Sequence, residues 1–400
     1  MCEALKSIRV LDMTNVLAGP FCCHQLAHMG AEVIKVEMPK SGDLARQLGA
    51  DAELNRQKMG ISFLAQNSGK KSITLDLKHE SGKAILRQLV KTADVLVENF
   101  RPGVMDRLGL GYEQLKDENS KLIYCGISGY GADGPMKKLP AYDQIIQGMS
   151  GVMSITGAPE NAPYRVGFPI ADTIGGMTAA FAVASAIAGR GESGEGCFID
   201  VSMLESTLAT MGWVASNYLV GDKTPTPMGN DNFTASPSGT FKTQEGLINM
   251  AANKQEQFES VCHVIERSDL ISDLRFATRQ ARLDNRKALT VLVEAEFARK
   301  SATEWDLLLN GAGVPAGRVL TVPEALALPQ IQQRELQGDF AKVPGIERDI
   351  KILRTGFKVD GKRPKVDTPP PFLGEHTKQI LSELGYGNEA QRELIAEGVV

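Results

Sequence analysis

Hydrophobic positions in the first half of the chain alternate between the period of a strand and that of a helix. The first such unit predicts a strand over 8–13, a helix over 19–28 and a second strand over 31–36. A strand, a helix and a strand joined by short turns form a βαβ unit with parallel strands and a right-handed crossover. Further predicted elements are strands at 71–77, 94–97, 121–127 and 197–202 and a helix at 81–91. The alternation predicts a doubly wound, Rossmann-like α/β domain with a parallel sheet.

The composition changes near residue 220. Residues 221–239 are dense in Pro, Gly, Asn, Asp, Ser and Thr, which is typical of a linker or a binding loop. The predicted elements that follow are a hairpin at 240–251, helices at 255–265 and 283–297, turns at 364–374 and a final helix at 377–384. With 400 residues, the chain is too long for one small core, so we expect two domains.

Asp172 stands between a short apolar run and a segment of small residues, 174–189. A membrane-spanning helix needs roughly 20 strongly apolar residues, so this segment is expected to be a buried helix that packs closely on its neighbours. Asp172 then lies near a helix N-terminus, where the helix dipole and free N–H groups favour a negative charge. The residue alone favours an N-cap, and a catalytic carboxylate is the alternative.

Composition indicates an ordinary soluble protein, with 42% hydrophobic residues, 23% charged residues and a net charge of -4. This mild charge predicts no binding to nucleic acid or to an anionic membrane. The lysine pairs 70–71 and 137–138 fit either a solvated face or contacts with the phosphates of a nucleotide-like ligand. Six cysteines show no metal-ligand spacing and follow no signal peptide, so we expect free thiols and a cytoplasmic location.

Several kinds of chemistry have no support in the sequence. Only Ala18-Gly19-Pro20 stands where a dinucleotide fingerprint would lie, and no P-loop, GxSxG or HExxH motif occurs. His24 and His28 are spaced for one metal on a helix face, yet no third ligand is near, so helix packing is favoured and no metal is predicted. Carboxylate chemistry remains, with Asp172 its best-placed candidate.

Many short segments occur in an order and at intervals that match one known family. They are RVLDMT (9–14), AGP (18–20), GAEVIKVE (30–37), GDLAR (42–46), NSGKKSITLDLK (67–78), ADVLVENFRPGVMDRLGLG (93–111), SGYG (128–131), GFPIAD (167–172), 239–258, 313–315 and LGEHT (373–377). On these segments the chain resembles, from end to end, the family III CoA-transferases, which include the formyl-CoA and carnitine CoA-transferases.

The resemblance implies an architecture and a set of partners. It implies a large CoA-binding α/β domain that begins with 1–220, a smaller α+β domain at 221–320, and a C-terminal segment at 321–400 that returns to the large domain. Two open-ring subunits would interlock as a homodimer. The substrates would be an acyl-CoA and a short carboxylic acid, and CoA would enter as a thioester substrate with no permanently bound cofactor.

The resemblance aligns Asp172 with the family's nucleophile. A carboxylate can attack an acyl-CoA thioester to give a mixed anhydride, and the released thiolate then gives an aspartyl-CoA thioester. Two departures from the family pattern matter. Leu17 replaces a glutamine, which argues against formyl or oxalyl groups, and Met38 replaces an arginine, which suggests a different adenine contact. The positions implied to bind CoA are Leu17, Ala18, Leu75, Lys78, Asn99, Phe100, Arg107, Tyr142 and Asp143.

The α-methylacyl-CoA racemases, a second branch of the family, are disfavoured. Tyr142 stands where the racemases have a histidine base, and phenols ionise only at roughly pH 10, so a tyrosine is a poor proton-abstracting base at neutral pH. Gln255 stands where they have a glutamate. Racemisation of an acyl-CoA and a non-catalytic CoA-binding role remain the alternatives to CoA transfer.

The acid substrate is the least determined feature. Arg46, Arg165 and Gly229 are candidates for its pocket, although an ion pair, a loop arginine and a turn are the simpler interpretations. A second carboxylate on the substrate would give such an arginine a bidentate partner. We therefore hypothesise transfer from succinyl-CoA to a C4–C5 dicarboxylate such as itaconate, mesaconate or citramalate.

Overall fold

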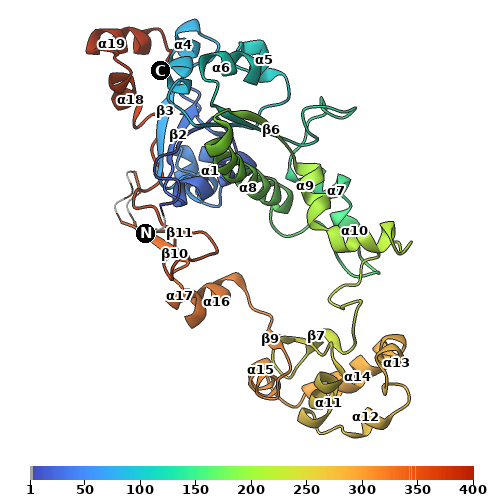
Figure 1. Ribbon diagram of the computed structural model, residues 1–400. Coiled ribbons are helices and arrows are strands. Elements are labelled where there is room, and N and C mark those ends of the chain that lie inside the picture. The colour runs from blue at the N-terminus through green and yellow to red at the C-terminus, as the bar shows by residue number, and fades with distance from the viewer. Residues whose placement is uncertain (1–2, 342, 344, 347) are drawn as a thin grey trace. The chain divides into compact units, whose positions relative to one another are not determined.

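The chain divides into two compact units in a computed structural model, which describes residues 3–341, 343, 345, 346 and 348–400 (Figure 1). The first unit comprises Met1–Val152, Arg165–Asp222 and Gln330–Val400, and the second comprises Met153–Tyr164 and Lys223–Pro329. The second unit thus includes a segment of twelve residues from inside the predicted first part, 1–220. That segment contains the turn-forming residues Gly157, Pro159, Asn161 and Pro163, but the sequence does not indicate that it joins the second unit.

A six-stranded parallel sheet forms the centre of the first unit, with strand order β3-β2-β1-β4-β5-β6. The doubly wound α/β prediction is confirmed. The order reverses between β1 and β4, and ligands of such sheets bind in the crevice beyond the carboxyl ends of the strands at that reversal. The strands are β1 (Arg9–Asp12), β2 (Glu32–Glu37), β3 (Lys70–Thr74), β4 (Val95–Glu98), β5 (Ile123–Ser128) and β6 (Cys197–Ser202).

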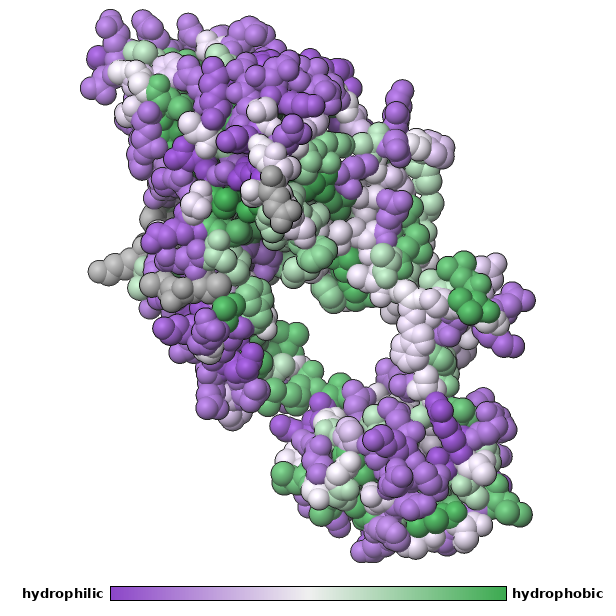
Figure 2. Space-filling model, viewed as in Figure 1, coloured by the Kyte–Doolittle hydropathy of each residue, from purple (hydrophilic) through white to green (hydrophobic). Residues whose placement is uncertain are grey.

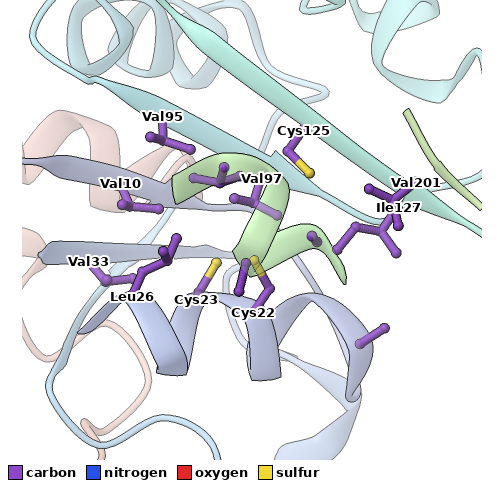
Figure 3. Packing of buried hydrophobic residues seen from close by; sticks show 14 of the residues in the cluster. Val10, Cys22, Cys23, Leu26, Val33, Val95, Val97, Cys125, Ile127 and Val201 are labelled. Carbon is purple, nitrogen blue, oxygen red and sulfur yellow. The ribbon is translucent and has the colours of Figure 1, made fainter. Parts of the chain in front are cut away.

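Helices cover both faces of the sheet. Alternate strand residues such as Val10 and Leu11 enter two different cores, because successive side chains of a strand point to opposite faces. Buried residues of α1 (Ala18–His28) and α8 (Ile170–Ser193) fill the first core, where Cys22, Cys23 and Cys125 pack as apolar side chains (Figure 3). The helices on the other face include α4 (Glu80–Val90), α5 (Val104–Leu108), α6 (Tyr112–Glu118), α18 (Thr377–Glu383) and α19 (Asn388–Ala396).

Helix α8 packs against α1 at a position that requires glycine. A Cβ on Gly176 would lie 2.3 Å from the carbonyl oxygen of Ala18, so any larger residue would separate the two helices. The opposite side of α8 is open, since Met177 and Phe181 are 49% and 74% exposed. Hydrophobic surface is visible over α1 and α8 (Figure 2). The predicted close packing is therefore confirmed on the α1 side, whereas the prediction that the helix is buried is wrong for its other side in the single chain.

Length and apolar composition alone would allow α8 to cross a membrane. It is the one helix of the described residues with this property, and 33% of its apolar window is buried. This is weak evidence for a span, because the core helix of a soluble protein meets the same criteria.

The C-terminal segment carries one helix more than predicted. Helix α18 matches the predicted final helix, but α19 follows it. Leu394 and Val399 from this last stretch are buried in the second core, and the Val399 carbonyl accepts a hydrogen bond from the Asp76 backbone. An antiparallel hairpin of β10 (Gln337–Phe340) and β11 (Ile350–Leu353) precedes these helices.

The first unit also contains several shorter helical elements. They are η1 (Leu44–Gln47), α2 (Ala52–Arg56), α3 (Ile61–Leu64), α7 (Asp143–Met149), η2 (Val152–Ile155, at the boundary with the second unit), α9 (Met203–Thr210) and α10 (Gly212–Leu219).

The second unit has its own sheet and core. Strands β7 (Ser238–Lys242), β8 (Leu247–Ala251) and β9 (Ala316–Arg318) are antiparallel, so the predicted hairpin around Glu245-Gly246 is confirmed. The predicted helix at 283–297 is divided at Asn285 into two. The helices of this unit are α11 (Gln255–Val264), α12 (Asp269–Ser272), α13 (Arg279–Asp284), α14 (Arg286–Phe297), α15 (Ala302–Gly311) and α16 (Val322–Ala327), and α17 (Pro329–Gln333) spans the boundary.

Candidate active site

Asp172 is the third residue of α8, and its side chain does not cap the helix. The residue before the helix is Pro169, which provides no side-chain cap, and the Asp172 carboxylate has no hydrogen-bond partner among the described residues. Burial, together with the neighbouring Asp143 carboxylate, raises the pKa of Asp172 to about 7. A desolvated carboxylate with no partner is poorly stabilised as an anion, which favours attack on an electrophile.

Asp143 caps α8 in place of Asp172. Its Oδ1 accepts the backbone N–H of Ala171 at 2.9 Å and that of Asp172 at 3.4 Å. Its Oδ2 accepts the amide of Gln147 at 2.7 Å and lies 3.8 Å from Arg165. The prediction that Asp143 contacts CoA is not supported, because its buried oxygens are already occupied and it does not line the cavity at Asp172.

A cavity of about 230 Å³ opens in front of Asp172. Its walls come from the segments that follow β1, β4 and β5, and therefore from the carboxyl edge of the sheet at the strand reversal. Asn15 and Asn99 join two of these segments by reciprocal hydrogen bonds of 2.8 Å. The predicted residues that this cavity brings together are Leu17, Ala18, Asn99, Phe100, Tyr142 and Asp172.

The N-terminus of α1 points free backbone donors toward this cavity. Leu17 precedes the helix without a side-chain cap, and the N–H groups of Leu17 and Ala18 have no acceptor among the described residues. Both residues line the cavity that Asp172 lines. A helix N-terminus with unpaired N–H groups stabilises an oxygen that develops negative charge.

A second cavity, of about 320 Å³, meets the first at Asn15 and Phe100, which line both. Three more predicted CoA-binding residues line it: Leu75, Lys78 and Arg107. Met38, which stands where the formyl-CoA enzyme has an arginine, lines it as well. The two cavities adjoin at Asn15 and Phe100 and are together called the groove; Asp172 lines the first cavity, and Lys78 and Arg107 line the second.

Two cationic side chains, Arg101 and Lys137, line the first cavity. The lysine pair 137–138 predicts a phosphate contact from the sequence, but its nearness to Asp172 depends on the chain fold after β5. Arg101 has no individual signal in the sequence.

Arg46 does not belong to a substrate pocket. Its side chain is fully buried, its Nε donates to Glu37 at 2.7 Å, and its Nη atoms reach Glu37 and the Pro371 carbonyl. It also lies over the ring of Phe63. Every side of the guanidinium has a partner, so the proposed role in binding a substrate carboxylate is wrong, and the arginine joins distant parts of the first unit.

Lys70 is likewise an interior residue and not part of a solvated face. Its Nζ binds Asp12 at 2.8 Å and the Pro20 carbonyl at 3.0 Å. Lys71 pairs with Glu32 at 2.6 Å. Lys70 is therefore closed to a phosphate, whereas Lys71 lies in a partly exposed surface ion pair.

The spaced histidines hold no metal cluster. His24 Nε2 lies 3.2 Å from the Ser68 hydroxyl, and His28 Nδ1 donates to the His24 carbonyl at 3.0 Å. No group of three potential ligands occurs within the described part of the chain.

The other residues considered from sequence lie in different places. Arg165 stays beside the site through Asp143 and is half exposed. Gly229 belongs to the second unit, where its N–H donates to the Gly157 carbonyl at a positive φ of 63°. Gln255, also in the second unit, accepts a hydrogen bond from Arg282 and donates one to Glu259. Cys2 lies outside the described residues.

The comparisons with known proteins agree with this geometry. The family model described as "CoA-transferase family III" matches residues 5–377. A succinyl-CoA:glutarate CoA-transferase of Mus musculus is 36% identical over 100% of this chain and 90% of its own length. An acetyl-CoA:oxalate CoA-transferase of Acetobacter aceti is 40% identical over 89% of this chain and 90% of its own length.

Solved structures show the same relationship. The crystal structure of a CAIB/BAIF family protein from Brucella suis superimposes with a TM-score of 0.84 at 35% identity, over 95% of this chain and 98% of that one. The sequence and fold matches thus both extend over nearly the whole chain. This chain is therefore a member of the family III CoA-transferases.

Proposed function

We propose that the enzyme transfers CoA from succinyl-CoA to a short dicarboxylic acid, through covalent intermediates on Asp172. The observation that carries the proposal is the unpartnered Asp172 carboxylate in one cavity of a groove whose other cavity is lined by Lys78 and Arg107. A nucleophile in one cavity and two cations in the adjoining one suit a thioester with a long, phosphate-bearing tail.

The first half of the reaction forms a covalent CoA adduct. An oxygen of the Asp172 carboxylate attacks the thioester carbon, the C–S bond breaks, and CoA thiolate leaves with the electron pair. The product is a mixed anhydride. The thiolate then attacks the Asp172 carbonyl carbon, the C–O bond to the acyl group breaks, and succinate leaves.

The second half repeats these steps in reverse order. The acceptor carboxylate attacks the Asp172–CoA thioester to form a new anhydride and thiolate. The thiolate attacks the acceptor's carbonyl carbon, and the break of the C–O bond restores the Asp172 carboxylate. No proton or electron is gained or lost over the cycle.

In this proposal, backbone N–H groups at the start of α1 stabilise the oxyanion. The N–H groups of Ala171 and Asp172 at the start of α8 donate to Asp143 and cannot serve an incoming oxygen. The N–H groups of Leu17 and Ala18 have no acceptor among the described residues and line the cavity. Donors of this kind lower the barrier of an acyl transfer when they are fixed before the charge develops.

CoA itself is expected to lie along the groove. Its phosphates would meet Lys78 and Arg107 in the second cavity, with Arg101 and Lys137 nearer to Asp172. Leu75 and Phe100 offer apolar surface for the adenine or the pantetheine arm. The enzyme would hold no permanent cofactor.

The acceptor class follows from the relatives and from the chain itself. The mouse relative is named for glutarate and the Acetobacter relative for oxalate, and both acids are dicarboxylates. Leu17 argues against oxalyl groups here, because it places an apolar side chain beside the reacting carbon. A C4–C5 acid such as glutarate, itaconate, mesaconate or citramalate is the proposed acceptor.

Racemisation of an acyl-CoA is the second candidate in this fold. It needs a base opposite Asp172, and no histidine is among the described residues that line the Asp172 cavity. Tyr142 lies there instead, 68% exposed. Entry of solvent deuterium at the α-carbon without an acceptor acid would favour this candidate over transfer.

One trapping experiment separates transfer from both alternatives. The protein is incubated with succinyl-CoA, treated with hydroxylamine or borohydride, and digested for mass spectrometry. We expect modification at Asp172, and we expect Asp172→Asn to form no adduct and to lose at least about a thousandfold in transfer rate. An unmodified Asp172 together with wild-type transfer by Asp172→Asn would overturn the proposal, and a non-catalytic protein would give neither adduct nor transfer.

We also propose a cytoplasmic homodimer whose subunits interlock. The exposed apolar side of α8 supports association, because Phe181, which is 74% exposed, would be buried against a second copy. Light scattering of the purified protein is expected to give twice the chain mass, and a monomer at micromolar concentration would contradict the proposal.

A further inference from the structure

A third cavity of the first unit begins behind Leu17. It has a volume of about 670 Å³, and Leu17 lines both this cavity and the one that contains Asp172. Thr173, the residue after Asp172, lines it too. Asp172 itself lines only the first cavity, and Leu17 separates that cavity from this one, hereafter the Leu17 cavity.

The geometry of a thioester requires two such spaces. The carbonyl carbon carries the CoA sulfur and the acyl chain in different directions, so a carbonyl held at Asp172 sends its two substituents apart. The groove through Asn15 and Phe100 to Lys78 is the path of the CoA arm in the proposed function. The acyl chain would then extend past Leu17 and Thr173.

The walls of the Leu17 cavity are mainly apolar, and its volume exceeds what a short acid fills. Cavities of roughly 300–1,000 Å³ hold drug-sized ligands, so an acid of five carbons would leave much of this one empty. The apolar side chains that form the walls are Phe21, Leu54, Ile61, Leu64, Met177, Ile350, Ile352 and Leu353.

Three lining residues carry buried polar atoms that lack a partner. They are His24 Nδ1, Gln66 Oε1 and Thr355 Oγ1, in residues only 3%, 8% and 2% exposed. Burial holds the pKa of His24 well below its usual value, so the ring is neutral and can donate or accept. Native proteins leave few such atoms unpaired, and each calls for an explanation.

A cation without an acidic partner also lines the cavity. Arg348 pairs with Asp51 at 2.9 Å and Lys351 with Asp339 at 3.6 Å. Arg354 has no carboxylate partner among the described residues, and its Nη1 donates only to the Glu335 carbonyl at 3.3 Å. A guanidinium in that condition can take a carboxylate in bidentate geometry.

We infer that the Leu17 cavity receives the acyl chain, and that its substrates extend to dicarboxylic acids of medium length, about six to ten carbons. The methylene chain would lie against the apolar walls, and the distal carboxylate would meet Arg354. The inference rests on the proposed function, since it places the reacting carboxylate at Asp172.

The test measures kcat/KM with succinyl-CoA for unbranched dicarboxylic acids of four to ten carbons and for monocarboxylic acids of the same lengths. We expect the eight-carbon diacid to react at least as well as glutarate, and at least tenfold better than the eight-carbon monoacid. A glutarate preference above tenfold over the eight-carbon diacid would overturn the inference.

Two variants test the cavity itself. Ala65 is an exposed lining residue, so Ala65→Trp can fill the space without replacing a core side chain. We expect it to lower the ratio of kcat/KM for the ten-carbon to the four-carbon diacid at least tenfold, whereas Ala52→Trp, at an exposed position of α2 that does not line the cavity, leaves that ratio unchanged. Arg354→Gln should lower the ratio of diacid to monoacid at eight carbons at least tenfold, with Lys362→Gln as the matched control.

Other outcomes count against the inference. An unchanged chain-length ratio in Ala65→Trp, or an equal loss for diacids and monoacids in Arg354→Gln, means that the acyl chain lies elsewhere. If Ala65→Trp changes the mass of the assembly in solution but not the chain-length ratio, a second copy of the chain fills the cavity. Single-turnover trapping of the Asp172–CoA adduct is run in parallel, because its absence would indicate failure of the proposed function and not of the cavity.

Discussion

The carboxylate of Asp143 accepts the backbone N–H of Asp172 at 3.4 Å, so one aspartate holds the start of α8 while the other remains free. The two negative groups are close enough for Asp143 to help raise the pKa of Asp172 to about 7, after the larger effect of burial. Structural capping and chemistry are thus divided between two aspartates that stand 29 residues apart.

The pH dependence of adduct formation follows from this pair. Only the ionised carboxylate attacks, so we expect the single-turnover rate with succinyl-CoA to rise through about pH 7 and to level off above it. Asp143→Asn removes the neighbouring negative charge and should move this limb to lower pH. Asp133→Asn, a change in an exposed loop, is the control, and an identical limb in Asp143→Asn would show that Asp143 does not act on the titration.

Asp172→Asn is expected to stabilise the fold while it abolishes transfer. The folded pKa lies above the unfolded value, so this group's contribution to stability is present below about pH 4 and is lost as the pH rises to about 7. Asparagine carries no charge to desolvate, so above pH 7 the variant should gain about 1–3 kcal/mol, a figure reduced from the full shift to allow for solvent.

Urea unfolding of both proteins at pH 4.5 and pH 8 measures this difference. The stabilisation should be larger at pH 8 than at pH 4.5. A variant that is less stable than the wild type at pH 8 would contradict the assigned burial cost.

Lys78 and Arg107 are expected to act on CoA and not on the acid. Loss of a hydrogen bond to a charged group costs roughly 1.5–3 kcal/mol, so Lys78→Ala and Arg107→Ala should each raise KM for succinyl-CoA by about tenfold or more. Their KM for the acceptor acid should change little. Lys121→Ala, an exposed lysine outside both cavities, serves as the control.

Removal of the ligand's phosphate identifies which contact is lost. If one of these side chains binds the 3′-phosphate, its variant and the wild type should have the same KM for the dephospho-CoA thioester. A tenfold difference that persists for both side chains with that substrate would place the 3′-phosphate elsewhere.

The sequence sufficed for the sheet and for the place of Asp172, because strand and helix periods are local and the helix begins close to the aspartate. It did not suffice for Asp143, since the cap of α8 comes from another helix. The exposed side of α8 was missed because a stripe of small residues looks the same whether its neighbour is in the same chain or absent from it. Arg354 was missed because its relation to Leu17 and His24 depends on the return of the C-terminal segment.

Arg46 is the clearest case in which residue type misled, and it gives a prediction on stability. Its guanidinium and the Glu37 carboxylate are buried together, with the Ser72 hydroxyl donating to Glu37 at 2.7 Å. Removal of one partner of a buried ion pair costs roughly 3–5 kcal/mol, because the other charge is left without compensation. Arg46→Met should therefore lower the free energy of unfolding by about that amount, and the double variant Glu37→Met/Arg46→Met should recover much of it.

The ratio of kcat/KM for glutarate to that for a five-carbon monoacid should be the same in the double variant as in the wild type. If this ratio falls at least tenfold while stability is retained, Arg46 would be a residue that binds the substrate carboxylate after all.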